Sequence, residues 1–268
     1  RETATRTALG SICLLILLDL NIYIFGYVAS IGSKTSGDID FSDLEKLRDS
    51  QKSSSAMCPN RESDNEFKNE IKIARKKKDT LGGSISVIVK GLPVGLGSYV
   101  HYDRKIDGRI AAAFMSVQSV KGVSIGNGIE AYKSFGTEFH DEILLDNKEL
   151  KRNTNNSGGI EGGMTTGEDL VATAYLKPIS TTLTPLKSVN LKTKEQVETV
   201  YERSDTCSVP RAVPIFETII AIEVLQCLLD KTGGDNKKEI IERKEKLPGK
   251  FIDDFDMGSE KWIMGYDL

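Results

Sequence analysis

A segment that has to be buried constrains this chain more than any other feature. Residues 210–229, PRAVPIFETIIAIEVLQCLL, are predicted to form a helix that is apolar almost all the way round. A helix with a single apolar stripe lies on a surface, whereas one that is apolar on every side belongs in a core. Pro210 stands at or near its first turn, where proline is favoured. The 268 residues therefore have to cover this helix, and they suffice for one large domain or two small ones.

The order of the other expected elements indicates the fold class. Strands are predicted at residues 22–31, 84–90 and 170–176, a strand and turn at 120–130, and helices at 1–18, 43–48, 66–76, 103–119 and 237–246. These elements do not alternate as regular βαβ units. The pattern favours an α+β architecture built in layers over a doubly wound parallel sheet.

The apolar stretch near the start is not a membrane span. Asp19 and Asn21 interrupt residues 8–32, and the uninterrupted run 12–18 is far shorter than the roughly 20 residues that cross a bilayer. We interpret it as a buried helix that breaks near Asp19 and is followed by a strand. Because the chain opens with Arg1 and not Met, and is helical in character from the start, we expect the true amino terminus to be missing.

Composition excludes several classes of function. Apolar residues make up 39% and charged residues 28%, as in ordinary soluble proteins, and the net charge of −3 does not drive binding to nucleic acid or an anionic membrane. The four cysteines are scattered without CxxC spacing, so neither a zinc site nor a disulfide framework is expected. Reduced thiols suit a cytoplasmic location. His101 and His140 are expected to be surface or half-buried side chains.

A run of glycines at residues 153–168, NTNNSGGIEGGMTTGE, is the strongest local signal. Glycine permits positive φ and lets the backbone approach a ligand closely, and successive N–H groups in such a loop can form an anion-binding concavity. The spacing matches neither GxGxxG nor GxxxxGK[ST], so neither of these two glycine-loop patterns applies. Taken alone, the run is more typical of a tight turn.

Two short segments add polar groups that are able to act on a ligand. Lys177, Pro178, Ile179, Ser180 and Thr181 end a predicted strand and offer one cation and two hydroxyls. Arg203, Ser204 and Asp205 precede the core helix, and side chains two apart on an extended segment point to the same side. Arg203 and Asp205 form either a plain ion pair or an anion clamp beside a proton-transfer group. In isolation the first segment is an ordinary strand end.

The order in which these motifs occur along the chain is specific to one protein family. RETATRTALG, TLGGSISVIVKGLPVGLGS, AAAFMSVQSVKGVSIGNGIEA, the glycine run, KPIST and RSDTCSVPRAVPIFET occur in this succession, and together they resemble chorismate synthase from Arg1 to about Asp230. The resemblance implies a layered β-α-β sandwich of that type, incomplete at the amino terminus. Residues 1–230 would be part of one domain with a variable, insertion-like segment at 34–78, and 231–268 a polar tail with a helix.

The resemblance also implies a function. Chorismate synthases are lyases of aromatic amino acid biosynthesis that eliminate phosphate from 5-enolpyruvylshikimate 3-phosphate, a small-molecule substrate, using reduced flavin mononucleotide (FMN). They form homotetramers, and NADP enters where the flavin is reduced, a step that the sequence leaves open as intrinsic or external. Carried over by motif, the flavin contacts are Gln118, Ser119, Gly162, Lys177, Pro178, Ile179, Ser180, Thr181 and Arg203, and Asp205 matches the catalytic acid near flavin N5.

Some family features are not found in these residues. These residues lack the two histidines that act as acids in the family, one of them in an SHG-like motif. They also lack the arginines that bind the substrate and an RSSA stretch before RETA. Thr206 stands where many members have proline. We therefore expect the chain alone to be inactive. Two alternatives stay open: a non-catalytic module that binds flavin or another anion, and an oligomerisation fragment with exposed apolar surface.

Overall fold

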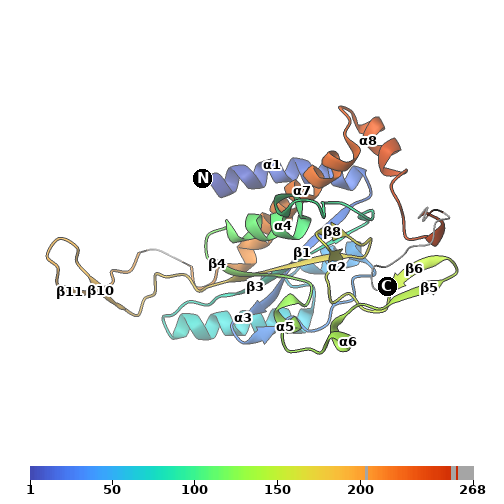
Figure 1. The fold of residues 1–268 in the computed structure, drawn as a ribbon. Helices are drawn as coiled ribbons and strands as arrows, with labels where there is room; N and C mark the ends of the chain where they lie inside the picture. Colours follow the sequence, from blue (N-terminus) through green and yellow to red (C-terminus); the bar gives the residue numbers. More distant parts are fainter. Residues whose placement is uncertain (203–204, 255–257, 259–268) are drawn as a thin grey trace, which may run out of the picture.

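A five-stranded antiparallel sheet forms the centre of the molecule, in the order β2-β1-β3-β9-β4 (Figure 1). This computed structural model describes residues 1–202, 205–254 and 258. The strands are β1 (Tyr23–Ile31), β2 (Lys34–Thr35), β3 (Gly83–Lys90), β4 (Val120–Ile125) and β9 (Leu170–Leu176). Helices and strands thus mix around an antiparallel sheet, which confirms the predicted α+β class.

Helices cover both faces of the central strands. All residues of β3 between its two ends are buried, so the strand does not alternate between core and solvent as a half-exposed strand does. The reason is that α7 (Val209–Thr232) packs on one face of β1 and β3, while α3 (Arg61–Lys76) lies against β1 and β2 on the other (Figure 1).

The helical layer is built around α7, which confirms the predicted core helix. α1 (Glu2–Asp19) and α4 (Ile106–Met115) pack on it, and Phe114 meets Phe216 edge to face with ring centroids 4.9 Å apart. Within the described residues, α7 is the one helix long and apolar enough to cross a membrane, but 67% of its most apolar stretch is buried in the protein. That burial is the arrangement of a core helix.

α1 crosses α7 at very short range. A Cβ atom placed on Gly10 would lie 2.3 Å from the carbonyl oxygen of Thr218, so only glycine allows this approach. The expectation that α1 is a buried helix was wrong: only Gly10 and Leu17 are buried, because one side of the helix packs on α7 and the other faces solvent.

The segment between β2 and β3 covers the open edge of β1. The Glu217 carboxylate of α7 accepts a 2.7 Å hydrogen bond from Gly26 N–H. From α2 (Leu44–Lys52), Gln51 donates to Gly26 O at 2.6 Å, and Arg48 donates both to Ile24 O and to Glu217. Unpaired edge strands invite aggregation, and these side chains satisfy the edge of β1 instead. Residues 34–78 are thus tied closely to the sheet.

Smaller elements surround this core. They are η1 (Tyr102–Arg104), α5 (Gly128–Ala131), α6 (Gly136–Phe139), β5 (Ile143–Asp146), β6 (Glu149–Arg152), β7 (Ile160–Glu161), β8 (Met164–Thr165), β10 (Lys187–Val189), β11 (Gln196–Glu198), α8 (Lys237–Lys244) and η2 (Ile252–Asp254). The β10–β11 hairpin projects away from the body as an arm (Figure 1). At the other side, the tail pairs with the β5–β6 hairpin, where Leu150 N–H donates to Lys250 O at 2.6 Å.

Helix ends differ from the sequence expectations for local reasons. α4 is shorter than the predicted 103–119, because Lys105 is extended and separates it from η1. α3 starts earlier than expected, because the side chain of Asn60 accepts hydrogen bonds from Glu62 and Ser63 N–H and so caps the helix at residue 61.

Candidate functional site

The carboxyl end of β9 and the amino end of β4 bring two predicted site segments together. Lys177 N–H donates to Ser119 O at 2.9 Å. Ser119 has a φ of 76°, which is uncommon for a residue with a side chain and marks a tight entry into β4. Ser119 is half-buried, while Lys177 and Pro178 are exposed. The structure thus joins the SVQS and KPIST motifs directly.

Gln118 connects this edge to the first turn of α1. The hydroxyl of Thr3 donates to Gln118 Oε1 at 3.1 Å, across 115 positions of sequence. Gln118 is exposed, so its amide group is accessible beside the start of the helix.

Residues 79–82 hold the KPIST loop and the segment around Asp205 in place. The hydroxyl of Thr80 donates to Ile179 O at 2.7 Å, and Leu81 N–H donates to Thr206 O at 2.9 Å. A Cβ on Gly82 would lie 2.3 Å from Leu176 O, so the backbones touch there. Ser180 is exposed and Thr181 is half-buried. The KPIST loop and the segment around Asp205, each about a hundred residues or more further along the chain, are therefore both fixed to residues 79–82.

Asp205 faces a cation that the sequence analysis did not single out. Arg211, in the first turns of α7, forms an ion pair with the Asp205 carboxylate. Both side chains are largely exposed, at 76% for Arg211 and 49% for Asp205. Arg203 and Ser204, named with Asp205 in the sequence analysis, lie outside the described residues.

The sequence analysis also missed the basic end of α3. A pocket of about 40 Å³ between the base of the arm and the end of α3 is lined by Arg75, Lys78, Thr181 and Asp205, among others. No pattern along the chain marks which cations of the run 75–78 line a pocket with Thr181.

Gly162 lies away from all of these residues. It forms with Gly163 the turn of the β7–β8 hairpin, with φ values of 60° and 86°, as a two-residue type I′ turn requires. The hairpin precedes β9, whereas Lys177 follows it. The base of the hairpin bonds to the first residues of β9, where Val171 N–H donates to Gly158 O, and β9 itself is about 20 Å long. Gly162 is exposed, and a Cβ there would meet nothing within 4 Å.

The other glycines of the run serve close packing. A Cβ on Gly158 would lie 2.3 Å from Gly126 N, and one on Gly159 would lie 2.6 Å from Asp169 O. The half-buried loop is also held by Asp141, whose carboxylate accepts hydrogen bonds from Asn156 N–H at 2.7 Å and Ser157 N–H at 2.9 Å. The tight-turn interpretation therefore accounts for most of the run.

Comparison with known proteins identifies the family of this chain. Residues 1–229 match the family model described as chorismate synthase. This chain belongs to the chorismate synthase family.

Relatives and a solved structure agree with that assignment. A chorismate synthase of Caldicellulosiruptor bescii is 42% identical over 93% of this chain and 66% of its own length. Chorismate synthase 1 of Bacillus cereus is 42% identical over 92% of this chain and 63% of its own length. A crystal structure of chorismate synthase superposes with a TM-score of 0.76 at 38% identity, covering 91% of this chain and 68% of that one. The chain thus spans just under two thirds of the curated relatives that it matches.

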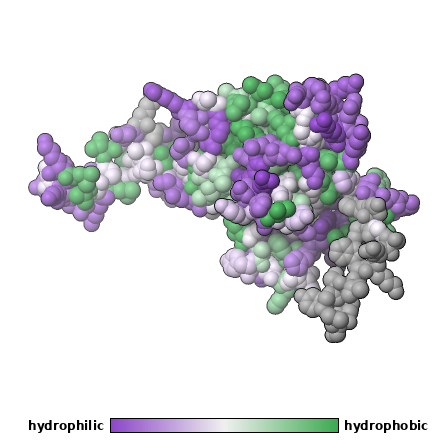
Figure 2. Space-filling view, turned by 45° about the horizontal axis from the view of Figure 1, so that its top comes forward, coloured by the Kyte–Doolittle hydropathy of each residue, from purple (hydrophilic) through white to green (hydrophobic). Residues whose placement is uncertain are grey.

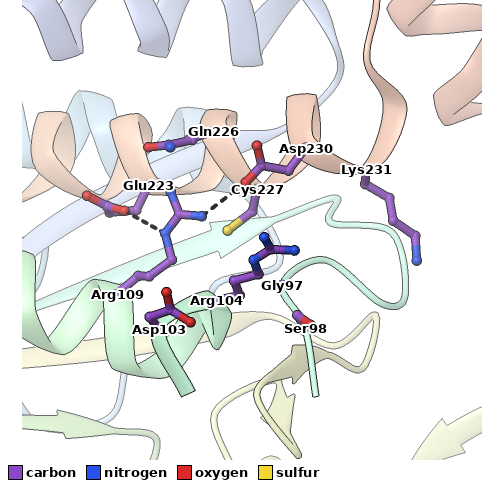
Figure 3. A pocket seen from close by; sticks show the side chains of 10 residues that line it. All are labelled: Gly97, Ser98, Asp103, Arg104, Arg109, Glu223, Gln226, Cys227, Asp230 and Lys231. Atoms are coloured by element: carbon purple, nitrogen blue, oxygen red, sulfur yellow. Dashed lines mark hydrogen bonds and ion pairs between the residues drawn. The ribbon is translucent and has the colours of Figure 1, made fainter. Parts of the chain in front are cut away.

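Another cavity of this chorismate synthase chain lies between α4 and the end of α7. It measures about 720 Å³ and contains none of the predicted site residues. In Figure 3 the Arg109 guanidinium reaches Glu223 and Asp230, at 3.1 and 3.2 Å. Burial raises the pKa of Cys227 beside them to about 11, so this thiol is unreactive near neutral pH. His101 and His140 are exposed, within the surface or half-buried range expected.

Proposed function

We propose that the protein containing this chain is a chorismate synthase, eliminating phosphate from 5-enolpyruvylshikimate 3-phosphate with the help of reduced FMN. The observation that carries the proposal is the convergence of separate family motifs on one end of β9. Ser119 bonds to Lys177, and Thr181 and Asp205 line the same pocket. Pairing of β4 with β9 puts Ser119 beside Lys177, and residues 79–82 hold the segment around Asp205 at the same end, so the segments that carry the family motifs adjoin one another.

The groups at this end of the sheet fit a phosphorylated flavin. Among the described residues, no carboxylate pairs with the Lys177 ammonium, which is exposed and ready to meet an anion. Gln118 offers an amide, and Ser180 and Thr181 offer hydroxyls on the same edge. Cations with adjacent hydroxyl and amide donors are the usual surroundings of a phosphate. Pro178 and Ile179 hold the loop in shape, since Ile179 O is bonded to Thr80.

Each residue then has a definite role. Reduced FMN held here would supply the electron density that the elimination of phosphate needs. Lys177, together with Arg203, neutralises negative charge on the flavin and substrate. Asp205 holds or moves a proton beside the flavin ring, and its ion pair with Arg211 keeps the carboxylate in place.

Gly162 fits this scheme through assembly. Within one copy its hairpin adjoins the opposite end of β9 from Lys177, and β9 is about 20 Å long. A flavin contact from Gly162 therefore joins the others most simply from a neighbouring copy in a homotetramer. The protein would act in the cytoplasm, with NADP taking part where the flavin is reduced.

The test measures binding and turnover separately. We expect the 268-residue chain to bind FMN but to form no chorismate from 5-enolpyruvylshikimate 3-phosphate with chemically reduced FMN, because the family's acidic histidines are not among its residues. Flavin binding is followed by fluorescence and chorismate by absorbance. Chorismate formed by the chain alone would refute the expected inactivity. A chain that binds no flavin would argue against the proposed site.

The main alternative is a non-catalytic flavin- or anion-binding module. This alternative predicts the same flavin binding by the chain, but it predicts a different coding sequence upstream of Arg1. In-frame SHG-like and RSSA motifs upstream of the Arg1 codon would support the enzyme, and their absence would support the module.

A further inference from the structure

The four consecutive basic residues 75–78 at the end of α3 do not all face the same way. α3 ends at Lys76, Lys77 caps it, and Lys78 has a φ of 58°, which turns the chain sharply before Asp79. As a result Arg75 and Lys78 line the small pocket with Thr181 and Asp205, whereas Lys76 and Lys77 do not. Basic residues in a last helical turn are favoured by the helix dipole, but the dipole does not select which of them face a pocket.

Both cations of the pocket are available to a ligand. Within residues 1–202, 205–254 and 258, neither Arg75 nor Lys78 has a side-chain hydrogen bond or ion pair. Two carboxylates also line the pocket: Asp205 forms its ion pair with Arg211, and Asp79 accepts a hydrogen bond from Thr80 N–H at 2.8 Å. Free cations beside hydroxyl groups, in a space of about 40 Å³, suit one small anionic group and leave no room for a flavin ring.

The pocket is also held firmly. The backbone carbonyl of Lys78 accepts a hydrogen bond from Thr184 N–H at 3.2 Å, at the base of the arm. Just after Lys78 along the chain, Thr80 and Leu81 donate hydrogen bonds to Ile179 O and Thr206 O at 2.7 and 2.9 Å. The end of α3 thus keeps its position relative to the KPIST loop, so that its cations need little reordering to meet a ligand.

We propose that Arg75 and Lys78 bind the phosphate monoester of a ligand that lies along the KPIST loop. This inference rests on the proposed function, and it makes the end of the segment 34–78 part of the site. The phosphate belongs either to FMN or to the phosphorylated substrate, since both carry the same group. The Arg75 guanidinium would bind two phosphate oxygens at once and Lys78 would act as a point charge.

The test compares two double variants of equal charge. Arg75→Gln with Lys78→Gln removes the cations that line the pocket, and Lys76→Gln with Lys77→Gln removes two from the same run that do not. Inorganic phosphate binding is measured by calorimetry. We expect the first variant to bind phosphate at least about tenfold more weakly, a loss of about 1.4 kcal/mol, and the second to stay close to the unaltered chain. Unchanged thermal unfolding shows that both are folded.

Two ligand pairs identify the source of the phosphate. If the flavin phosphate sits here, the first variant loses affinity for FMN but not for riboflavin. If the substrate phosphate sits here, it loses affinity for 5-enolpyruvylshikimate 3-phosphate and keeps both flavins. Equal effects of the two variants, or no phosphate binding by the unaltered chain, would overturn the inference. If the unaltered chain binds phosphate but neither flavin, and only the first variant loses phosphate binding, the anion site is supported. That result would count against the proposed function and not against this inference.

Discussion

Asp141 fastens the glycine run to the body of the protein. Its side chain is only 7% exposed. Burial by itself would raise the pKa of this carboxyl, but hydrogen bonds from Thr154, Ser157 and Asn156 outweigh burial and hold the pKa below its usual value. A carboxylate whose pKa is lower in the folded state stabilises the fold above its unfolded pKa, and that contribution is lost as the pH falls through the folded pKa.

Replacing Asp141 with Asn should therefore cost stability in a pH-dependent way. An amide places N–H groups against the donors that the carboxylate accepts, so we expect a loss of about 1–3 kcal/mol at pH 7. The variant should also lose less stability than the unaltered protein as the pH drops below about 4. Urea unfolding at several pH values measures both effects. Asp146→Asn, at the exposed end of β5, serves as the control, and an equal loss there would contradict the assignment.

Glycines of the run should differ in their tolerance of alanine. At Gly162, alanine meets no atom within 4 Å, so only the positive φ of 60° is costly, at about 1–2 kcal/mol. At Gly158 the same strain is joined by a contact of 2.3 Å with Gly126 N, so we expect a loss of about 3 kcal/mol or more. Thermal unfolding of both variants checks the order. Similar melting temperatures would show that the loop relaxes freely.

At the scale of elements, α2 stabilises the sheet through its side chains more than through packing. Arg48 lies 4.8 Å from the centre of the Phe25 ring and donates to Glu217 at 2.7 Å. Glu217 is 7% exposed, and burial raises its pKa, with Arg48 and Gly26 N–H offsetting part of the effect. A raised carboxyl pKa in the folded state means that the fold gains stability as the pH falls toward that pKa.

Arg48→Met should leave the Glu217 charge without its cation. We expect a loss of about 3 kcal/mol at pH 7, at the low end for buried pairs because Arg48 is 36% exposed. The deficit should shrink as the pH falls, since protonation removes the buried charge. Adding Glu217→Gln to Arg48→Met should recover part of the loss at pH 7. Urea unfolding of the two variants measures this, and a double variant no more stable than Arg48→Met would exclude an unpaired charge as the cause.

At the scale of the molecule, the outer face of α1 exposes several large apolar side chains to solvent. Leu9, Ile12 and Leu15 are 55%, 57% and 66% exposed on one side of the helix. Figure 2 shows apolar side chains gathered on this upper part of the surface. Contiguous apolar patches of this kind mark surfaces that bind other polypeptide or lead to aggregation.

We expect the chain to self-associate through this face. Sedimentation velocity should show larger species as the protein concentration rises. Replacing Leu9, Ile12 and Leu15 with Gln should reduce them, because the apolar area is removed from contact. Val189→Gln with Leu191→Gln, in the exposed arm, is the control that removes apolar surface elsewhere. Association that persists in the α1 variant and vanishes in the arm variant would assign the contact to the arm.

The local sequence pattern was enough to predict those elements whose conformation depends on residues close together along the chain. β9 was predicted at residues 170–176 and occupies those residues, and the core helix around 210–229 was predicted within a few residues. The hairpins β5–β6, β7–β8 and β10–β11 were not predicted, because their strands have two to four residues and carry little periodicity. For the site, motif order indicated Ser119, Lys177 and Asp205, but no linear pattern marked Arg75, Lys78 or Arg211.

The sequence by itself determined the family, the α+β class and the core helix, since each depends on residue types in a fixed order or on periodicity along one segment. Only the tertiary structure decided which glycines pack against backbone, that the hairpin of Gly162 adjoins the opposite end of β9 from Lys177, and that the end of α3 meets the KPIST loop. The physical reason is the same in each case. These relations come from the pairing of strands and the crossing of helices, which bring together residues a hundred positions apart, and a side chain's direction there depends on turns such as those at Lys78 and Ser119.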